Sequence, residues 1–183
     1  MWQPMNVPNL LTLARILLVP ITVIFLMQGA FAKALILLVV SGITDALDGF
    51  FARILNQQTV LGSYLDPIAD KALFASCFVT LSIKGIIPGW FTVIVISRDF
   101  IILVGIAILS IMSIPYEIRP SFIGKLTTTL QLSTLVFFLV SRILPGTIDY
   151  MWLMILQWVT VAFTIISGLN YMFRGAKLNS YKA

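Results

Sequence analysis

Four aspartates between residues 45 and 70 constrain the fold of this chain more than any other feature, because the surrounding sequence is strongly apolar. Asp45 and Asp48 are three residues apart, and Asp66 and Asp70 are four apart. Each pair therefore shares one face of a helix. A short polar link separates the two pairs. Two helices joined by such a link pack antiparallel, so we expect the carboxylate pairs to meet.

Carboxylates that lie close together repel one another, so a bound cation best explains the grouping. Oxygen ligands with no His or Cys nearby favour Mg²⁺, Mn²⁺ or Ca²⁺ over zinc. The chain has no His, and its single cysteine, Cys77, lies in an apolar run. Four carboxylates can hold two divalent ions, an arrangement that clamps phosphoryl oxygens during in-line displacement. The alternative, helix-end aspartates without a ligand, is disfavoured because intramembrane carboxylates are costly.

The composition predicts an all-α, polytopic membrane protein. The chain has 183 residues, of which 60% are hydrophobic and 10% charged, whereas soluble domains carry about 25% charged residues. This length suits a single domain, residues 1–183, with about six transmembrane helices of roughly 20 residues each. We expect these spans at about residues 10–28, 32–54, 65–83, 90–112, 126–144 and 150–173.

The distribution of cations predicts the orientation in the membrane. The net charge of +5 is read as topology and attraction to a lipid surface, not as nucleic-acid binding. With the N-terminus inside, the inner side is richer in Lys and Arg, which places the aspartates at the cytoplasmic side. The absence of a transit-peptide pattern favours a bacterial inner membrane. The expected inner cations are Arg53, Arg119, Lys125, Arg174, Lys177 and Lys182, and the outer ones are Lys33, Lys84 and Arg142.

Other polar residues inside the expected spans have two possible explanations each. Arg15 either extends to the membrane interface or contacts an anionic group in a cavity. Arg98 and Asp99 form an adjacent charged pair that indicates a polar interior face. The hydroxyls of residues 127–129 either bond back to helix carbonyls or serve a functional site.

The residues from Asp45 to Asp70 also resemble a known family. They follow the pattern D-x2-D-G-x2-A-R-x8-G-x3-D-x3-D, which is similar at every position to the signature of the CDP-alcohol phosphatidyltransferases. The stretches NVPNLLTLAR, ISRD and RPSFIGKLTTTLQL extend the resemblance to the branch that makes anionic glycerophospholipids. In that family six membrane helices form the enzyme, which is usually a homodimer. CDP-diacylglycerol is the donor, and an acceptor hydroxyl attacks the phosphorus bearing diacylglycerol while CMP leaves.

The resemblance implies specific roles for the motif residues. The four aspartates would bind two Mg or Mn ions, and Asp70 would also be the general base. Small residues would leave room for the cytidine moiety, although packing of small residues between membrane helices is an alternative explanation. The implied donor-binding residues are Asp45, Gly49, Ala52, Arg53, Gly62 and Asp66, with Arg53 on the pyrophosphate.

Two acceptors agree with the resemblance, namely phosphatidylglycerol, as in CMP-forming cardiolipin synthases, and glycerol 3-phosphate, as in phosphatidylglycerophosphate synthases. The latter typically carry a second Arg in the fourth span and G-K-x-K-T before the fifth. Here Thr127 stands where the second Lys is expected. Fewer cations weaken capture of a small dianionic phosphate, which favours phosphatidylglycerol. With either acceptor, Arg98, Arg119 and Lys125 are the expected ligands of the acceptor phosphate.

Two other classes of function are less consistent with the motif. A metal-ion transporter also uses intramembrane carboxylates, but it does not need the Gly, Ala and Arg positions. An inactive lipid-binding or scaffold protein would be expected to lack one of the aspartates, and all four are present.

Overall fold

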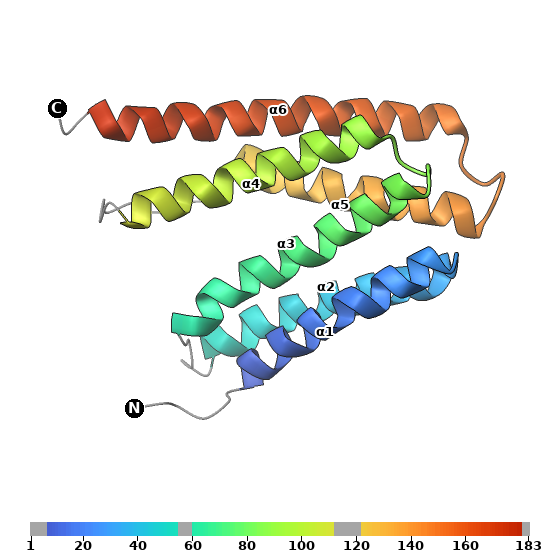
Figure 1. Ribbon diagram of the computed structural model, residues 1–183, viewed down its shortest axis with the longest axis horizontal. Helices are drawn as coiled ribbons and strands as arrows, with labels where there is room; N and C mark the ends of the chain where they lie inside the picture. The colour runs from blue at the N-terminus through green and yellow to red at the C-terminus, as the bar shows by residue number, and fades with distance from the viewer. Residues whose placement is uncertain (1–6, 55–59, 112–121, 181–183) are drawn as a thin grey trace. The chain divides into compact units, whose positions relative to one another are not determined.

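The protein is all-α, as predicted. The computed structural model describes the backbone of residues 7–54, 60–111 and 122–180, and the side chains of residues 14–44, 69–105 and 122–173. Within these backbone ranges the chain forms six α-helices (Figure 1). They are α1 (Val7–Met27), α2 (Phe31–Ile54), α3 (Val60–Ile83), α4 (Gly89–Ile111), α5 (Phe122–Ile143) and α6 (Tyr150–Ser180).

Three helix ends differ from the predicted ones. Helix α3 begins at Val60 rather than near Leu65, α5 begins at Phe122 rather than near residue 126, and α6 continues to Ser180 rather than ending near residue 173. Apolar content alone was a poor guide to these ends, because helical hydrogen bonding continues through polar residues and through Gly62. A glycine inside a helix costs only about 1 kcal/mol relative to alanine.

Glycines end two of the helices. Gly29 follows α1 with a φ of 77°, and Gly85 follows α3 with a φ of 66°. After α1, the Gly29 amide donates to the Leu26 carbonyl and the Ala30 amide donates to the Phe25 carbonyl. The same pair of bonds closes α3, and it satisfies carbonyls that would otherwise lack partners at the helix end.

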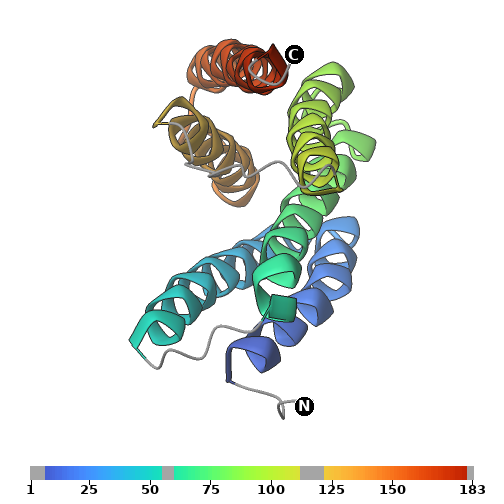
Figure 2. The ribbon, with the colours of Figure 1, turned by 90° about the vertical axis from the view of Figure 1, so that its left-hand side faces the viewer.

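The chain divides into two compact units, Met1–Ile86 and Ile87–Ala183. In the first unit α1 packs against both α2 and α3 (Figure 2). The end of α2 and the beginning of α3 lie at the same end of this unit as the beginning of α1 (Figure 1). At the opposite end, Lys84 donates to the carbonyl of Met27 at 2.8 Å. The single domain predicted over residues 1–183 stays a prediction.

The second unit is built around α6, which packs against α4 and α5. Asp149 precedes α6 and accepts a hydrogen bond from the Met151 amide at 3.2 Å, a typical N-cap. Trp90 of α4 stacks on Trp158 of α6, with ring centroids 5.2 Å apart. The buried apolar side chains of this unit are Ile87, Phe91, Val95, Leu135, Phe138, Leu139, Leu153 and Val161.

The surface of the described helices is unusually apolar for a soluble protein. Large apolar residues are exposed, including Leu17 at 66% and Phe173 at 73%, while Arg15 and several threonines are buried. Such an arrangement suits hydrocarbon surroundings, in which polar groups must find partners inside the protein. Among the described residues, two stretches are long and apolar enough to cross a membrane, namely Phe122–Ile143 and Tyr150–Phe173.

Candidate functional site

The aspartate motif lies on two consecutive helices. Asp45 and Asp48 are near the C-terminal end of α2, and Asp66 and Asp70 are in α3, further along the helix than predicted because α3 begins early. Only the side chain of Asp70 is among those described. The predicted meeting of all four carboxylates therefore stays a prediction, as do the donor-binding roles of Gly49, Ala52, Arg53 and Gly62, whose side-chain surroundings also lie outside the described residues.

Asp70 forms an ion pair with a buried arginine from a neighbouring helix. The distance from Arg15 Nη1 to Asp70 Oδ1 is 2.9 Å, and the side chains are 1% and 30% exposed. Of the two explanations for Arg15, contact with an anionic group is confirmed. Sequence reasoning left Arg15 out of the site, although its position inside an apolar run was the available signal.

The chemistry of these residues suits divalent cations. The sequence positions of the aspartates, i and i+3 on α2 and i and i+4 on α3, fall on one face of each helix by the helical period. Oxygen donors of this kind are what Mg²⁺ and Mn²⁺ prefer. Among the described side chains no three His, Cys, Asp or Glu residues gather as a metal site, but that set includes only one of the four aspartates. The metal prediction thus remains untested.

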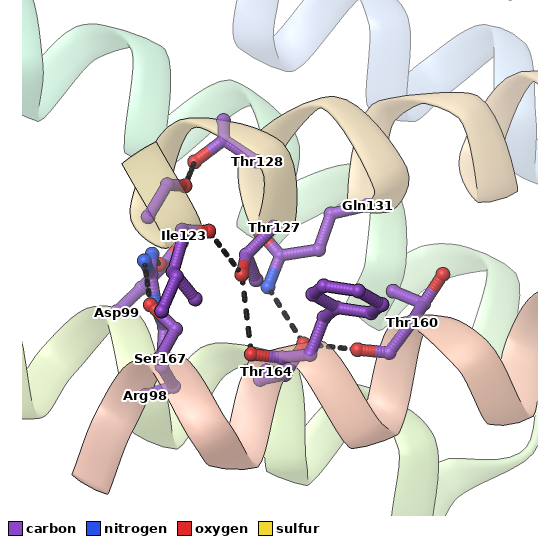
Figure 3. Close-up of polar contacts among 11 residues, drawn as sticks. Arg98, Asp99, Ile123, Thr127, Thr128, Gln131, Thr160, Thr164 and Ser167 are labelled. Carbon is purple, nitrogen blue, oxygen red and sulfur yellow. Dashed lines mark hydrogen bonds and ion pairs between the residues drawn. The ribbon is translucent and has the colours of Figure 1, made fainter. Parts of the chain in front are cut away.

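Arg98 occupies a buried polar cluster between α4 and α6 (Figure 3). It is 7% exposed; its Nη1 donates to Asp99 at 2.7 Å and its Nη2 donates to Ser167 at 2.8 Å. The guanidinium also lies over the ring of Tyr171, with 5.9 Å between the guanidinium carbon and the ring centroid. The buried Nε has no hydrogen-bond partner among the described residues. An unsatisfied charged donor is costly, so this atom favours an incoming acceptor.

Of the other two residues predicted to bind the acceptor phosphate, only Lys125 lies in the described part of the chain. Lys125 is exposed in the first turns of α5, because this helix begins at Phe122 rather than near residue 126. Arg119 lies outside the described residues. Neither Ser167 nor Tyr171 was predicted, because nothing in the sequence indicates that α6 contacts Arg98.

The three threonines near the start of α5 bond back to helix carbonyls. Thr127, Thr128 and Thr129 donate to the carbonyls four residues earlier at 2.8, 3.1 and 3.1 Å. Thr127 is fully buried and also lies 3.1 Å from the Phe163 carbonyl of α6 (Figure 3). These hydroxyls are satisfied within the helix bundle, so the structural explanation is confirmed for their hydrogen bonding.

Further hydrogen bonds between polar side chains lie along the contact between α5 and α6. Gln131 donates to Thr164 at 3.3 Å, and the hydroxyls of Thr134 and Thr160 are 2.8 Å apart. All four side chains are at most 5% exposed. Contacts of this type join helices where hydrophobic burial cannot. These hydrogen bonds thus act together with the buried apolar side chains of α5 and α6 in holding the two helices together.

Comparisons with known proteins agree with the motif. A family model described as CDP-alcohol phosphatidyltransferase matches residues 5–166. The rat cardiolipin synthase (CMP-forming) is 32% identical over 96% of this chain and 63% of its own length. The CDP-diacylglycerol–glycerol-3-phosphate 3-phosphatidyltransferase of Bacillus subtilis is 29% identical over 91% of this chain and 93% of its own length.

A probable phosphatidylglycerophosphate synthase of Mycobacterium tuberculosis is 31% identical, covering 94% of this chain and 82% of the relative. The chain spans 63% of the length of the rat and human cardiolipin synthases that it matches. The relatives therefore carry both names that the sequence left open. The family model covers most of the chain, and the resemblance seen in the motif is confirmed: this chain belongs to the CDP-alcohol phosphatidyltransferase family.

Proposed function

We propose that this protein transfers a phosphatidyl group from CDP-diacylglycerol to a glycerol hydroxyl, releasing CMP, in the synthesis of anionic phospholipids. The observation that carries the proposal is the complete eight-position motif on α2 and α3, two helices whose adjoining ends lie together in the first unit. Membership of the family and the names of relatives from both branches support the same reaction class.

In this reaction Asp70 accepts the proton of the acceptor hydroxyl while the oxygen attacks the phosphorus that carries diacylglycerol. A new P–O bond forms, and the bond from that phosphorus to the CMP oxygen breaks. Arg53 holds the diphosphate, and Gly49, Ala52 and Gly62 leave space for the nucleotide. Two Mg or Mn ions on Asp45, Asp48, Asp66 and Asp70 would neutralise the diphosphate and the leaving CMP.

We favour phosphatidylglycerol as the acceptor, which makes the protein a cardiolipin synthase. The support comes from position 127, where the other branch typically carries a lysine. Thr127 is fully buried and satisfied by α5 and α6, so this position supplies no cation. Arg98, Arg119 and Lys125 then serve an acceptor phosphodiester, which carries one negative charge. The second candidate acceptor is glycerol 3-phosphate, the acceptor named in the Bacillus subtilis relative.

We also propose that all six helices span a bacterial inner membrane, with the aspartates at the cytoplasmic side, and that the protein is a homodimer. The exposed apolar side chains of the described helices support the first point, and the distribution of Lys and Arg supports the orientation. The homodimer rests on the family resemblance.

A product assay tests the reaction and the acceptor together. Purified protein in lipid micelles receives CDP-diacylglycerol and Mn²⁺ with either phosphatidylglycerol or glycerol 3-phosphate, and the lipids are separated by mass. We expect cardiolipin from phosphatidylglycerol, no product from glycerol 3-phosphate, and loss of activity in EDTA that Mg²⁺ or Mn²⁺ restores. Phosphatidylglycerophosphate alone would replace the favoured acceptor with the second one, and Mn²⁺ flux into liposomes without any lipid product would point to a transporter.

A further inference from the structure

Arg15 is buried in a position where a charged side chain is difficult to explain by packing. It lies within α1 and is 1% exposed, while the adjacent Ile16 and Leu17 are 39% and 66% exposed. The guanidinium therefore points into the helix bundle and away from the surface that these neighbours form. Burying an arginine is favourable only when the charge is paired.

The ion pair joins two helices. Arg15 Nη1 of α1 is 2.9 Å from Asp70 Oδ1 of α3, and these two helices pack against each other. Arg15 contacts the Asp70 carboxylate from the buried side. The Asp70 side chain is 30% exposed, so it still reaches the surface of the described structure. A buried guanidinium beside one carboxylate oxygen attracts the carboxylate and restricts its orientation more than a solvent-exposed lysine does.

Stability alone does not account for this pair. Replacing a buried ion pair with apolar residues of similar volume is often neutral or stabilising, because the desolvation cost of two charges disappears. Leucine or methionine at position 15 would also fit the apolar composition of α1. A positively charged residue at this point is therefore better explained by what it does for Asp70.

We propose that Arg15 is a positioning residue for Asp70. It fixes the direction of the carboxylate that takes the acceptor proton, and it offsets part of the negative charge that four neighbouring aspartates would create. The inference rests on the proposed function, in which Asp70 is the base. Arg15 acts through its contact with Asp70 Oδ1, and no contact with either substrate is assigned to it.

The test compares Arg15→Gln, Arg15→Lys and a control, Arg142→Gln, which removes an exposed arginine from the last turn of α5. We expect kcat to fall about 10- to 100-fold in Arg15→Gln, the usual loss when a partner that orients a ligand is removed. Arg15→Lys keeps the charge and recovers part of the loss. The KM for CDP-diacylglycerol and the Mn²⁺ bound at saturation, measured by electron paramagnetic resonance, match the control in both variants.

A second measurement, the melting temperature, does not depend on enzyme activity. In EDTA, Asp70→Asn breaks the ion pair while the Arg15 charge stays buried, so we expect a lower Tm than in the wild type. Adding Arg15→Gln removes the buried charge of the broken pair, so the double variant should melt at a higher temperature than Asp70→Asn alone. A further fall in Tm on adding Arg15→Gln would contradict the pairing.

Two results would overturn the positioning role. One is a kcat in Arg15→Gln equal to that of Arg142→Gln. The other is a parallel loss of kcat, Mn²⁺ binding and Tm, which would mean that Arg15 acts through the fold. Failure of the proposed function is separate, because it would appear as a wild-type protein that makes no lipid product from CDP-diacylglycerol with either acceptor.

Discussion

At the scale of single residues, some buried polar side chains of the described helices have an acceptor for every donor, and others keep a donor that has no acceptor. The threonines of α5 donate to carbonyls of their own helix. Arg98 instead retains a buried Nε that has no acceptor among the described residues, beside Asp99 and Ser167, which occupy its other nitrogens. A residue with two fixed contacts and one open donor is well suited to orient an anion that arrives later.

The open donor of Arg98 predicts a selective effect of Arg98→Gln on the acceptor. The KM for the acceptor lipid should rise about tenfold or more, since a hydrogen bond to a charged group contributes about 1.5–3 kcal/mol, whereas the KM for CDP-diacylglycerol should stay unchanged. Ser167→Ala should raise the acceptor KM by a smaller factor, because it loosens the guanidinium without removing it. The control is Ser141→Ala, whose hydroxyl donates only to the carbonyl of Phe138 among the described contacts. Equal increases in both KM values would contradict an acceptor role.

The sequence predicted Arg98 and Asp70 as site residues, and it paired Arg98 with Asp99, but it could not assign their partners on other helices. Arg98 and Asp99 were visible as a charged pair inside an apolar span, and Asp70 was visible from its spacing to Asp66. The contacts of Arg98 with Ser167 and of Asp70 with Arg15 join helices far apart in the chain. Such contacts depend on which helix faces meet, and an apolar sequence pattern around the whole helix does not specify this.

At the scale of helices, apolar run length predicted how many helices would form but not where α3 and α5 begin or where α6 ends. Helix ends depend on capping and on local hydrogen bonds, as Gly29 and Gly85 show after α1 and α3. The early start of α3 places Gly62 inside a helix, where the sequence had indicated a link. The longer α6 carries Arg174 and Lys177 on helical backbone rather than in a tail.

The contact between α5 and α6 gives a prediction at this scale. Thr134→Val and Thr160→Val should each lower the free energy of unfolding by about 0.6 kcal/mol, the average for interhelical hydrogen bonds in membranes. The double variant should lose less than the sum, because both changes remove the same contact. Thr129→Val is the control, since Thr129 is exposed and donates to the Lys125 carbonyl. Unfolding in mixed micelles measures these values, and additive losses would refute the pairing.

At the scale of the whole molecule, the distribution of exposed and buried side chains indicates the solvent for which the chain is built. Exposed leucine, phenylalanine and tryptophan residues on the described helices contrast with buried threonines and arginines. The composition predicted this apolar surface, because a chain with 60% hydrophobic residues has too few polar side chains to cover its surface. The composition did not indicate which residues are buried, and only the packing of the helices identifies them.

The orientation proposed for the membrane can be tested by labelling. Native Cys77 is fully buried, so it should remain unlabelled. In intact bacterial spheroplasts, a membrane-impermeant maleimide should label Lys33→Cys directly and Lys125→Cys only after lysis, because the positive-inside rule places these exposed positions on opposite sides. The reverse pattern would mean that the aspartate motif faces the outer side.

In the proposed membrane topology, α6 is synthesised after α5, so an α5 hydroxyl that depended on α6 alone would at first have no hydrogen-bond partner in the bilayer. Thr134 and Thr160 avoid this difficulty, because each hydroxyl also lies 2.8 Å from the carbonyl four residues earlier in its own helix. A hydroxyl proton can therefore point to its own helix during insertion and turn to the other helix afterwards. The α5–α6 hairpin is thus suited to insertion as separate helices and to assembly as a later step.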